Sequence, residues 1–394
     1  MLKDKNIILG ITGSIAAYKA VDIASRLIKE GAKVEVVMTE AAGWFIAPLA
    51  LRSITGRAVV TDMFDDESEH TIEHVALAEA ADLVVIAPAT ASLIAKLAAG
   101  IADEMPSLVV LATKAPVIIA PAMNVNMYEN PITQDNLAKL KARGFTVIDP
   151  ERGRLASGRV GLGRLANTDK IMGTIKQVLG RQGDLAGKTL VVTAGGTQEP
   201  IDPVRHITNP SSGKMGYAIA EAARDRGASV RLVSAPTSLP EPAGVEVIAV
   251  KTTAEMQKAV AKAVKGADVL VMAAAVTDYQ ARAVAEDKIK KDRPDLELEL
   301  VRTPDILAGV EGDFIRVGFA AESSDIVANA KKKLASKKLD MIVANDITAA
   351  DSGFGVDTNR VVIIDRKGET ELPLMSKRQV AERILDGVAK LLKR

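Results

Sequence analysis

A chain of 394 residues is too long for one ordinary hydrophobic core, so two domains are expected. A formal net charge of +1 and an aromatic content of 3% argue against binding to nucleic acid or to a membrane surface. With no cysteine and three histidines, the chain has no disulfides or thiolate metal sites, and a histidine-rich metal centre is disfavoured. Neither a signal peptide nor an apolar run of the ~18 residues that a membrane helix needs is recognisable, which predicts a cytoplasmic α/β protein.

Short apolar strands alternate with helical stretches along the first half of the chain. We expect strands at 6–11, 32–39, 81–90, 116–124 and 145–150, and a helix that follows the first strand and ends near Glu30. Continuous apolar strands separated by helices are typical of a parallel sheet covered on both faces. Residues 1–180 are therefore predicted to form one doubly wound, Rossmann-like domain.

Candidate binding residues follow these strands, because ligands of doubly wound sheets lie at the carboxyl ends of the strands. The turn in "TGSIAAYK" can present backbone N–H groups to one phosphate, although it lacks the dinucleotide pattern GxGxxG. The candidates here are Gly13, Ser14, Ile15, Thr39, Pro88, Thr90 and Ser92. For Thr90 and Ser92 the alternative is a cap at the start of the next helix.

Polar residues also follow the fourth expected strand. In "APAMNVNM", Asn124 lies between two methionines, one of them Met127, and an asparagine that caps a turn is the ordinary explanation. His74 in "HTIEHVAL" is either a site residue or a surface histidine on a helix.

The stretch "GRLASGRVGLGRL" has four glycines and three arginines around Ser157. Its glycine content excludes a helix or a central strand. We predict a mobile, cationic flap at about 151–166.

The alternation of strands and helices begins again after "GRQGDLAGK", residues 180–188. This segment interrupts the alternation and is predicted to be a linker. Strands are expected at 189–196, 229–236, 268–276, 314–322 and 339–346, and a helix begins near Lys214. The sequence therefore predicts two doubly wound, mostly parallel-sheet α/β domains in series, the second at 188–394.

The densest motif of the second half is "TAGGTQEPIDPVRHITNPSSGKMG". Its loop carries Arg205 and Asn209, and "SSGKMG" opens a helix whose N-terminus can hold an anion. It is not a Walker A loop, because Met215 follows Lys214 where a hydroxyl is required. The segments "AAAVTDYQ", "EDKIKK", "TPDIL", "GFAAES" and "KKKLASKKLD" follow at or after strand ends, although a lysine-rich helix face is usually only solvated.

"TGSIAAYK", His74, "APATA", "PAMNxxM" and the flap ending in "GxGRL" together resemble the flavin-dependent cysteine decarboxylases. With the segments of the second half, the resemblance covers nearly the whole chain. It then points to the bifunctional family of coenzyme A biosynthesis, in which phosphopantothenoylcysteine decarboxylase is joined to phosphopantothenate–cysteine ligase.

For the first half, the resemblance implies FMN, with its phosphate at residues 13–15 and Thr39 and its ring near 88–92. It implies that His74 assists at the flavin–substrate interface, and that Asn124, with Met127 nearby, holds the substrate. The family's proton donor is a cysteine in the flap, and Ser157 occupies that position here. Since a hydroxyl is a far weaker acid than a thiol of pKa about 8.5, protonation of the enethiolate should suffer most.

For the second half, the resemblance implies that CTP and Mg²⁺ activate 4'-phosphopantothenate for coupling to L-cysteine. Lys288 would neutralise phosphate charge, and Asn209 and Arg205 would face the acyl intermediate. The residues implied to bind CTP are Met272, Ala273, Ala274, Asp278, Pro304, Asp305, Ile306, Leu307, Phe319, Lys333 and Lys337. The family also implies a homo-oligomer in which first halves trimerise and second halves dimerise into a dodecamer.

Two other classes of function compete with this interpretation. A non-catalytic FMN-binding regulatory or interaction subunit is supported by Ser157 and opposed by the intact set of ligase residues. A pair of NAD(P)-dependent domains is opposed by the lack of GxGxxG in either half.

Overall fold

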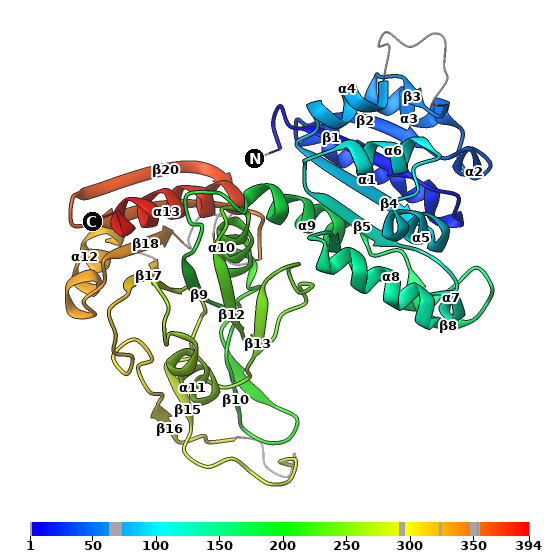
Figure 1. The fold of residues 1–394 in the computed structure, drawn as a ribbon. Coiled ribbons are helices and arrows are strands. Elements are labelled where there is room, and N and C mark those ends of the chain that lie inside the picture. The colour runs from blue at the N-terminus through cyan, green and yellow to red at the C-terminus, as the bar shows by residue number, and fades with distance from the viewer. Residues whose placement is uncertain are drawn as a thin grey trace. The chain divides into compact units, whose positions relative to one another are not determined.

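The computed structural model describes residues 2–62, 73–290, 296–322, 325–346, 353 and 355–393. The chain forms two compact units, Met1–Leu179 and Gly180–Arg394 (Figure 1). Each unit is built on its own large sheet, as the alternation of strands and helices predicts.

The sheet of the first unit has six strands in the order β3-β2-β1-β4-β5-β6, and all neighbouring pairs are parallel. The strands are β1 (Asn6–Ile11), β2 (Lys33–Met38), β3 (Val59–Val60), β4 (Leu83–Ala89), β5 (Val117–Pro121) and β6 (Thr146–Val147). The strand order reverses between β1 and β4, which is where such sheets bind their ligands.

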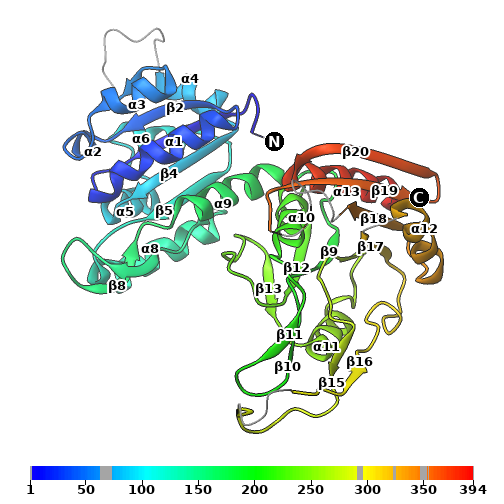
Figure 2. The same ribbon diagram turned by 180° about the vertical axis from the view of Figure 1, so that it is seen from behind.

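Helices cover both faces of this sheet. They are η1 (Ile15–Lys19), α1 (Ala20–Lys29), α2 (Glu40–Gly43), α3 (Pro48–Thr55), α4 (Glu73–Ala80), α5 (Ala91–Ala99), α6 (Met105–Ala112), α7 (Val125–Tyr128), α8 (Pro131–Ala142) and α9 (Thr168–Gly180). Because side chains alternate along a strand, Ile7 and Leu9 of β1 pack with α1 and α9, whereas Ile8 packs with α5, α6 and α8. The two opposite views show α6 in front of the sheet in Figure 1 and α1 in front in Figure 2.

The sheet of the second unit has eight strands in the order β13-β12-β9-β14-β17-β18-β19-β20. They are β9 (Thr189–Ala194), β12 (Ser229–Ser234), β13 (Glu246–Ala249), β14 (Val269–Met272), β17 (Ile315–Glu322), β18 (Met341–Asp346), β19 (Thr358–Asp365) and β20 (Gly368–Ser376). The strands are parallel up to β18, and β19 and β20 add antiparallel pairs. The predicted mostly parallel α/β class is confirmed, and the antiparallel strands are an addition.

The second sheet is also covered on both faces. The helices α10 (Lys214–Asp225) and α13 (Lys377–Leu392) pack on the face that carries Val192, and α11 (Thr253–Ala263) packs on the face that carries Val191. The helix α12 (Ile326–Ser336) lies between β17 and β18 in the chain. Two small antiparallel pairs complete the unit, β10 (Gln198–Pro200) with β11 (His206–Thr208), and β15 (Tyr279–Ala281) with β16 (Leu300–Arg302).

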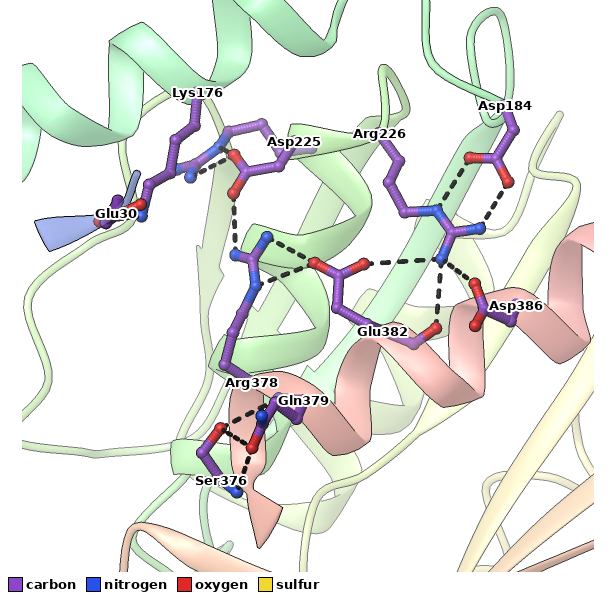
Figure 3. Close-up of polar contacts among 11 residues, drawn as sticks. Glu30, Lys176, Asp184, Asp225, Arg226, Ser376, Arg378, Gln379, Glu382 and Asp386 are labelled. Carbon is purple, nitrogen blue, oxygen red and sulfur yellow. Dashed lines mark hydrogen bonds and ion pairs between the residues drawn. The ribbon is translucent and has the colours of Figure 1, made fainter. Parts of the chain in front are cut away.

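A buried charged cluster joins α10 to α13 (Figure 3). Arg224 Nε and Nη2 donate to Asp225 Oδ1 at 2.9 and 2.7 Å, and both side chains are at most 2% exposed. Asp225 Oδ2 accepts no hydrogen bond of ordinary geometry, but it lies 2.8 Å from Arg378 Nη1. Arg378 Nη2 also pairs with Glu382 at 2.7 Å. The carboxylate of Asp225 therefore has a cation on each side.

The expected linker at 180–188 packs on the second unit. Leu185 is fully buried in its core, and the Leu185 N–H donates to the carbonyl of Arg226 at 3.1 Å. The Arg226 side chain pairs with Asp184 at 2.8 Å and with Asp386 at 2.9 Å (Figure 3). These contacts hold the segment on α10 and α13.

Candidate active sites

The turn after β1 holds the first group of predicted residues. Ser14 Oγ accepts from the Ala16 N–H at 3.3 Å and caps η1. Among the described residues, no acceptor receives the backbone N–H groups of Gly13, Ser14 and Ile15. Three such donors next to a helix start are suited to one phosphate group.

The hydroxyl predicted after β2 also caps a helix. Thr39 is buried, and its Oγ1 accepts from the Ala42 N–H at 3.2 Å at the start of α2. Ser92 lies on α5 and is exposed. Thr39 therefore has a local structural role.

Thr12 connects the ends of β1 and β4. Thr12 Oγ1 donates to the Pro88 carbonyl at 2.8 Å and accepts from the Thr90 N–H at 3.0 Å. Thr90 Oγ1 in turn caps α5 by accepting from the Leu93 N–H at 3.3 Å. Thr90 is therefore the N-cap of α5, as the structural alternative for this residue predicted.

Asn124 and Ser157, 33 residues apart, form a direct contact. Asn124 Oδ1 caps α7 by accepting from the Asn126 N–H at 3.0 Å, and its Nδ2 donates to Ser157 Oγ at 3.2 Å. One asparagine therefore serves as a turn cap and also reaches the flap.

The flap is a β-hairpin of β7 (Glu151–Arg154) and β8 (Val160–Arg164), a separate two-stranded sheet. The Met123 N–H donates to the Gly163 carbonyl at 2.9 Å, and a Cβ on Gly163 would overlap the Met123 carbonyl oxygen. Gly163 also has a φ of 142°, a region that only glycine occupies readily. The hairpin therefore lies against the Asn124 turn because residue 163 is glycine.

A cavity of about 360 Å³ lies between the β1 turn, the Asn124 turn and the hairpin. Of the predicted residues, Ser14, Ile15, Asn124 and Ser157 line this cavity. The following do not: Gly13, Thr39, His74, Pro88, Thr90, Ser92 and Met127. His74 is half-buried on α4, and Met127 is 49% exposed on α7. The sequence reasoning missed the cations Lys19, Arg154 and Arg164, which also line it.

A larger cavity of about 650 Å³ in the second unit is lined by the carboxyl end of β14, by β17 and by the start of α10. All residues implied to bind the nucleotide line it, together with Asn209: Met272, Ala273, Ala274, Asp278, Pro304, Asp305, Ile306, Leu307, Phe319, Lys333 and Lys337.

Hydrogen bonds between loops shape this cavity. Asn209 Nδ2 donates to the Val276 carbonyl at 3.1 Å, and Thr303 Oγ1 donates to the Thr277 carbonyl at 2.5 Å. Lys337 Nζ lies 3.4 Å from Asp305 Oδ2. The loop after β14 is therefore held by two other parts of the cavity wall.

Arg205 and Lys288 do not line the larger cavity. Arg205 Nη2 donates to the Ile289 carbonyl at 3.2 Å, and its Nη1 lies 3.3 Å from Asp202. Asp202 also accepts from the Ile289 N–H at 3.2 Å. Arg205 and Asp202 thus hold the backbone of the residue next to Lys288, whose side chain is exposed.

Two lysines at helix starts were not predicted as site residues. Lys214 and Lys377 line the larger cavity. Lys214 Nζ donates to the Gly355 carbonyl at 2.8 Å and to Asp357 at 2.7 Å, and Lys377 Nζ donates to the Gly353 carbonyl at 3.0 Å. Burial lowers the pKa of Lys377, and the charge of Lys214 lowers it further. Lys214 stands in "SSGKMG", whereas no motif marks Lys377.

Neither unit has a ready-made metal cluster within the ranges that the structure describes: no three His, Cys, Asp or Glu side chains gather there. The same ranges contain no helix with the length and apolar character needed to cross a membrane.

Comparison with protein families assigns a class to each unit. The family model described as "Flavoprotein" matches residues 1–180, and that described as "DNA/pantothenate metabolism flavoprotein C-terminal domain" matches residues 185–392. The parallel sheet of the first unit and the mostly parallel sheet of the second, each with a cavity beside its strands, thus belong to a two-domain flavoprotein of pantothenate metabolism.

Curated relatives match over the full length. "Coenzyme A biosynthesis bifunctional protein CoaBC" of Bacillus subtilis is 46% identical, over 100% of this chain and 98% of that protein. The protein of the same name from Escherichia coli K12 is 42% identical, over 98% and 97%. The chain belongs to this bifunctional coenzyme A biosynthesis family, which confirms the resemblance.

Solved structures match the two units separately. The C-terminal domain of a CoaBC protein is 40% identical, with a TM-score of 0.47, over 54% of this chain and 98% of that one. The FMN-dependent cysteine decarboxylase SpaF is 31% identical, with a TM-score of 0.40, over 45% and 97%.

Proposed function

We propose that the second unit uses CTP to couple 4'-phosphopantothenate to L-cysteine, and that the first unit decarboxylates the product with FMN to give 4'-phosphopantetheine. The observation that carries the proposal is the larger cavity. Four separate segments of the second half, each of which the family resemblance assigns to CTP, line one cavity of about 650 Å³.

The coupling needs an activated carboxyl group, because an amine cannot displace oxide from a carboxylate. Attack of the carboxylate oxygen on the α-phosphorus of CTP forms an acyl-CMP and breaks the bond to pyrophosphate. The amine of L-cysteine then attacks the acyl carbon, loses a proton and displaces CMP. No nucleophilic side chain is required, so positioning and charge neutralisation are the protein's contribution.

The larger cavity supplies those two contributions. The side chain of Asn209 is fixed through Val276, which leaves its Oδ1 to accept from the incoming amine. Lys333 and Lys337 provide positive charge at the wall. Mg²⁺ binds readily through phosphate oxygens and one or two carboxylates, so the lining, which contains Asp278 and Asp305, fits this ion.

The ligase proposal predicts pyrophosphate release that requires CTP, 4'-phosphopantothenate and Mg²⁺ together. Lys288→Gln should lower turnover about 10²-fold, as loss of an electrostatic stabiliser does. Lys258→Gln, an exposed lysine on α11, is the matched control and should turn over normally. No CTP-dependent pyrophosphate would overturn the ligase proposal, and normal turnover of Lys288→Gln would remove the role of that residue.

The first unit fits FMN through the three unpaired N–H groups of residues 13–15, which make one phosphate site. When bound, FMN supplies a reversible hydride acceptor for the carbon that bears the thiol, which provides an electron sink for loss of carbon dioxide. We assign Asn124 to the substrate carboxylate or amide, with Met127 beside it. His74 is assigned to the flavin–substrate interface, and Ser157 is the weak acid that faces the enethiolate.

Release of the cofactor by denaturation tests the flavin proposal. FMN is expected rather than FAD, because no adenosine-binding pattern follows the phosphate turn. FAD in the released fraction, or a colourless protein that FMN does not reconstitute, would contradict it.

Self-association is proposed as well, in the dodecamer that the family implies. Exposed apolar side chains on the first unit support it: Trp44 is 86% exposed, Leu49 69% and Tyr18 60%. Light scattering should give a multiple of the 41.6 kDa chain mass, and a monomer would contradict this proposal.

A further inference from the structure

The second unit contains a buried carboxylate that the proposed coupling reaction does not use. Glu199 lies on β10, is 1% exposed and does not line the larger cavity. Within the described part of the chain, no ion pair involves its carboxylate. A glutamate is rarely buried without a cation, because removing its charge from water is costly. Its hydrogen-bond partners therefore show what the residue is for.

Three buried threonines surround this carboxylate. Thr253 donates to Glu199 Oε1 through its N–H and its Oγ1, each at 2.7 Å, and Thr277 Oγ1 donates to the same oxygen at 3.3 Å. Thr197 Oγ1 lies 3.2 Å from Thr253 Oγ1 and 3.1 Å from Thr277 Oγ1. A hydroxyl has one proton, and those of Thr253 and Thr277 point to the carboxylate, so Thr197 donates to one of them. The carboxylate thus fixes the direction of every hydrogen bond in this threonine cluster.

The threonine cluster also holds the loop after β14. The Thr277 N–H donates to Thr197 Oγ1 at 3.0 Å. On the other side, Thr303 Oγ1 donates to the Thr277 carbonyl, and the Thr303 N–H donates to the Asp278 carbonyl at 3.0 Å. The backbone of Thr277 and Asp278 is therefore held from two sides.

The carboxylate of Asp278 is free, in contrast to the backbone that carries it. Asp278 is exposed and lines the larger cavity, and among the described residues its carboxylate takes part in no hydrogen bond or ion pair. Asp305, the other carboxylate of the lining, lies 3.4 Å from Lys337. A free carboxylate on a fixed backbone is preorganised to bind a ligand.

We propose that Glu199 and Thr197 are positioning residues of the second unit, which act through Thr277 to hold the Asp278 carboxylate where it can bind the Mg²⁺ of CTP. The inference rests on the ligase function proposed above. Neither Glu199 nor Thr197 lines the cavity, so their effect on CTP has to pass through the loop. The cost of burying Glu199 is then offset by hydrogen bonds that also order the nucleotide site.

The test replaces Thr197 by valine, which removes the hydroxyl and leaves the Thr277 N–H without its acceptor. Pyrophosphate release by the full chain is measured while CTP, L-cysteine or Mg²⁺ is varied in turn. The KM for CTP should rise about tenfold, as expected when a buried N–H loses its partner. The Mg²⁺ concentration for half-maximal rate should rise with it, and the KM for L-cysteine should not change. Thr197→Ser keeps the hydroxyl and should restore both values.

Thr252→Ala is the matched control, because it weakens the same region without touching the threonine cluster. Thr252 Oγ1 caps α11 by accepting from the Glu255 N–H at 3.2 Å. Its loss should lower the melting temperature and leave the KM for CTP unchanged. Thr253→Val removes one hydroxyl of the cluster and no acceptor of the loop, so the KM for CTP should rise about threefold. This milder variant decides the question if Thr197→Val does not fold.

An unchanged KM for CTP in folded Thr197→Val, or in Thr253→Val if that variant is needed, would overturn the inference and leave the ligase proposal in place. The same conclusion would follow if the KM for L-cysteine rose equally, or if Thr252→Ala raised the KM for CTP as much. If the unmodified chain releases no pyrophosphate from CTP, both the inference and the ligase proposal fail.

Discussion

Replacing Asp225 by asparagine tests how much the cluster between α10 and α13 stabilises the second unit. The carboxylate is fully buried between Arg224, which is 2% exposed, and Arg378, which is 34% exposed. Asparagine keeps the shape and one acceptor for Arg224, but its amide nitrogen then faces the other guanidinium. Removing one partner of a buried ion pair costs about 3–5 kcal/mol. We expect the lower end, about 3 kcal/mol, because one hydrogen bond survives and Arg378 reaches solvent.

The assay is pulsed hydrogen exchange with mass spectrometry across a urea series, which reads the free energy of unfolding of each unit from its own peptides. Peptides of α10 and α13 should shift to lower urea, and those of α1 and α5 should not. Asp386→Asn is the control, because Asp386 pairs with Arg226 at 2.9 Å but is 46% exposed, so it should cost less than about 1 kcal/mol. Equal losses in the two variants, or an equal shift of the first unit, would refute the reasoning.

Three further predictions concern the flap and the segment that carries Lys288. When the protein is given phosphopantothenoylcysteine, the flavin should bleach in about one turnover. Ser157→Cys should restore steady formation of 4'-phosphopantetheine, because a thiol of pKa near 8.5 is a usable acid. Equal steady rates for the unmodified chain and the Ser157→Cys variant would show that Ser157 suffices. Gly163→Ala should detach the hairpin and speed tryptic cleavage after Arg159, at a cost above about 1 kcal/mol. Gly158→Ala is strained by a φ of 81° but has no atom near its Cβ, so it should speed cleavage less. Unchanged cleavage of Gly163→Ala would contradict this prediction. Burial acts to raise the pKa of Asp202, but N–H donors including that of Ile289 outweigh it and hold the pKa below 3.8. The hydrogen bond from the Ile289 N–H to Asp202 should therefore persist above pH 3.8 and be lost as the pH falls through the lowered pKa. The loss is measured as faster hydrogen exchange of the Ile289 amide. The Asp202→Asn variant should show no such pH-dependent change.

The parallel core was predictable because buried parallel strands are continuous apolar runs. Thus β1, β4, β9 and β12 begin within two residues of the expected strands. The antiparallel strands β19 and β20 were missed for different reasons. In β20 only Leu372 is buried and no apolar run forms, whereas β19 has the short apolar run Val361–Ile364, which the sequence analysis did not assign to a strand. The three-residue strands of the small hairpins are too short to show any period.

The residues that the resemblance assigns to the nucleotide line one cavity, as expected for segments that follow the carboxyl ends of parallel strands. Arg205 and Lys288 do not line this cavity, because they lie on connections whose path depends on tertiary contacts such as those of Asp202. Their assigned roles stay predictions. Lys377 was missed because a lysine at a helix start has no local signature, and it joins the cavity lining through tertiary contacts such as its hydrogen bond to the Gly353 carbonyl.

The packing of residues 180–188 determines where the gene can be divided. A second-half fragment that begins at 188 would lose the buried Leu185 and leave Arg226 without Asp184. It would also uncover the strip of α10 against which Gly180 packs so closely that a Cβ would overlap the Asp225 carbonyl. A fragment that begins at Gly180 keeps all of these contacts. Separate expression of the two halves should therefore divide the chain on the amino side of Gly180.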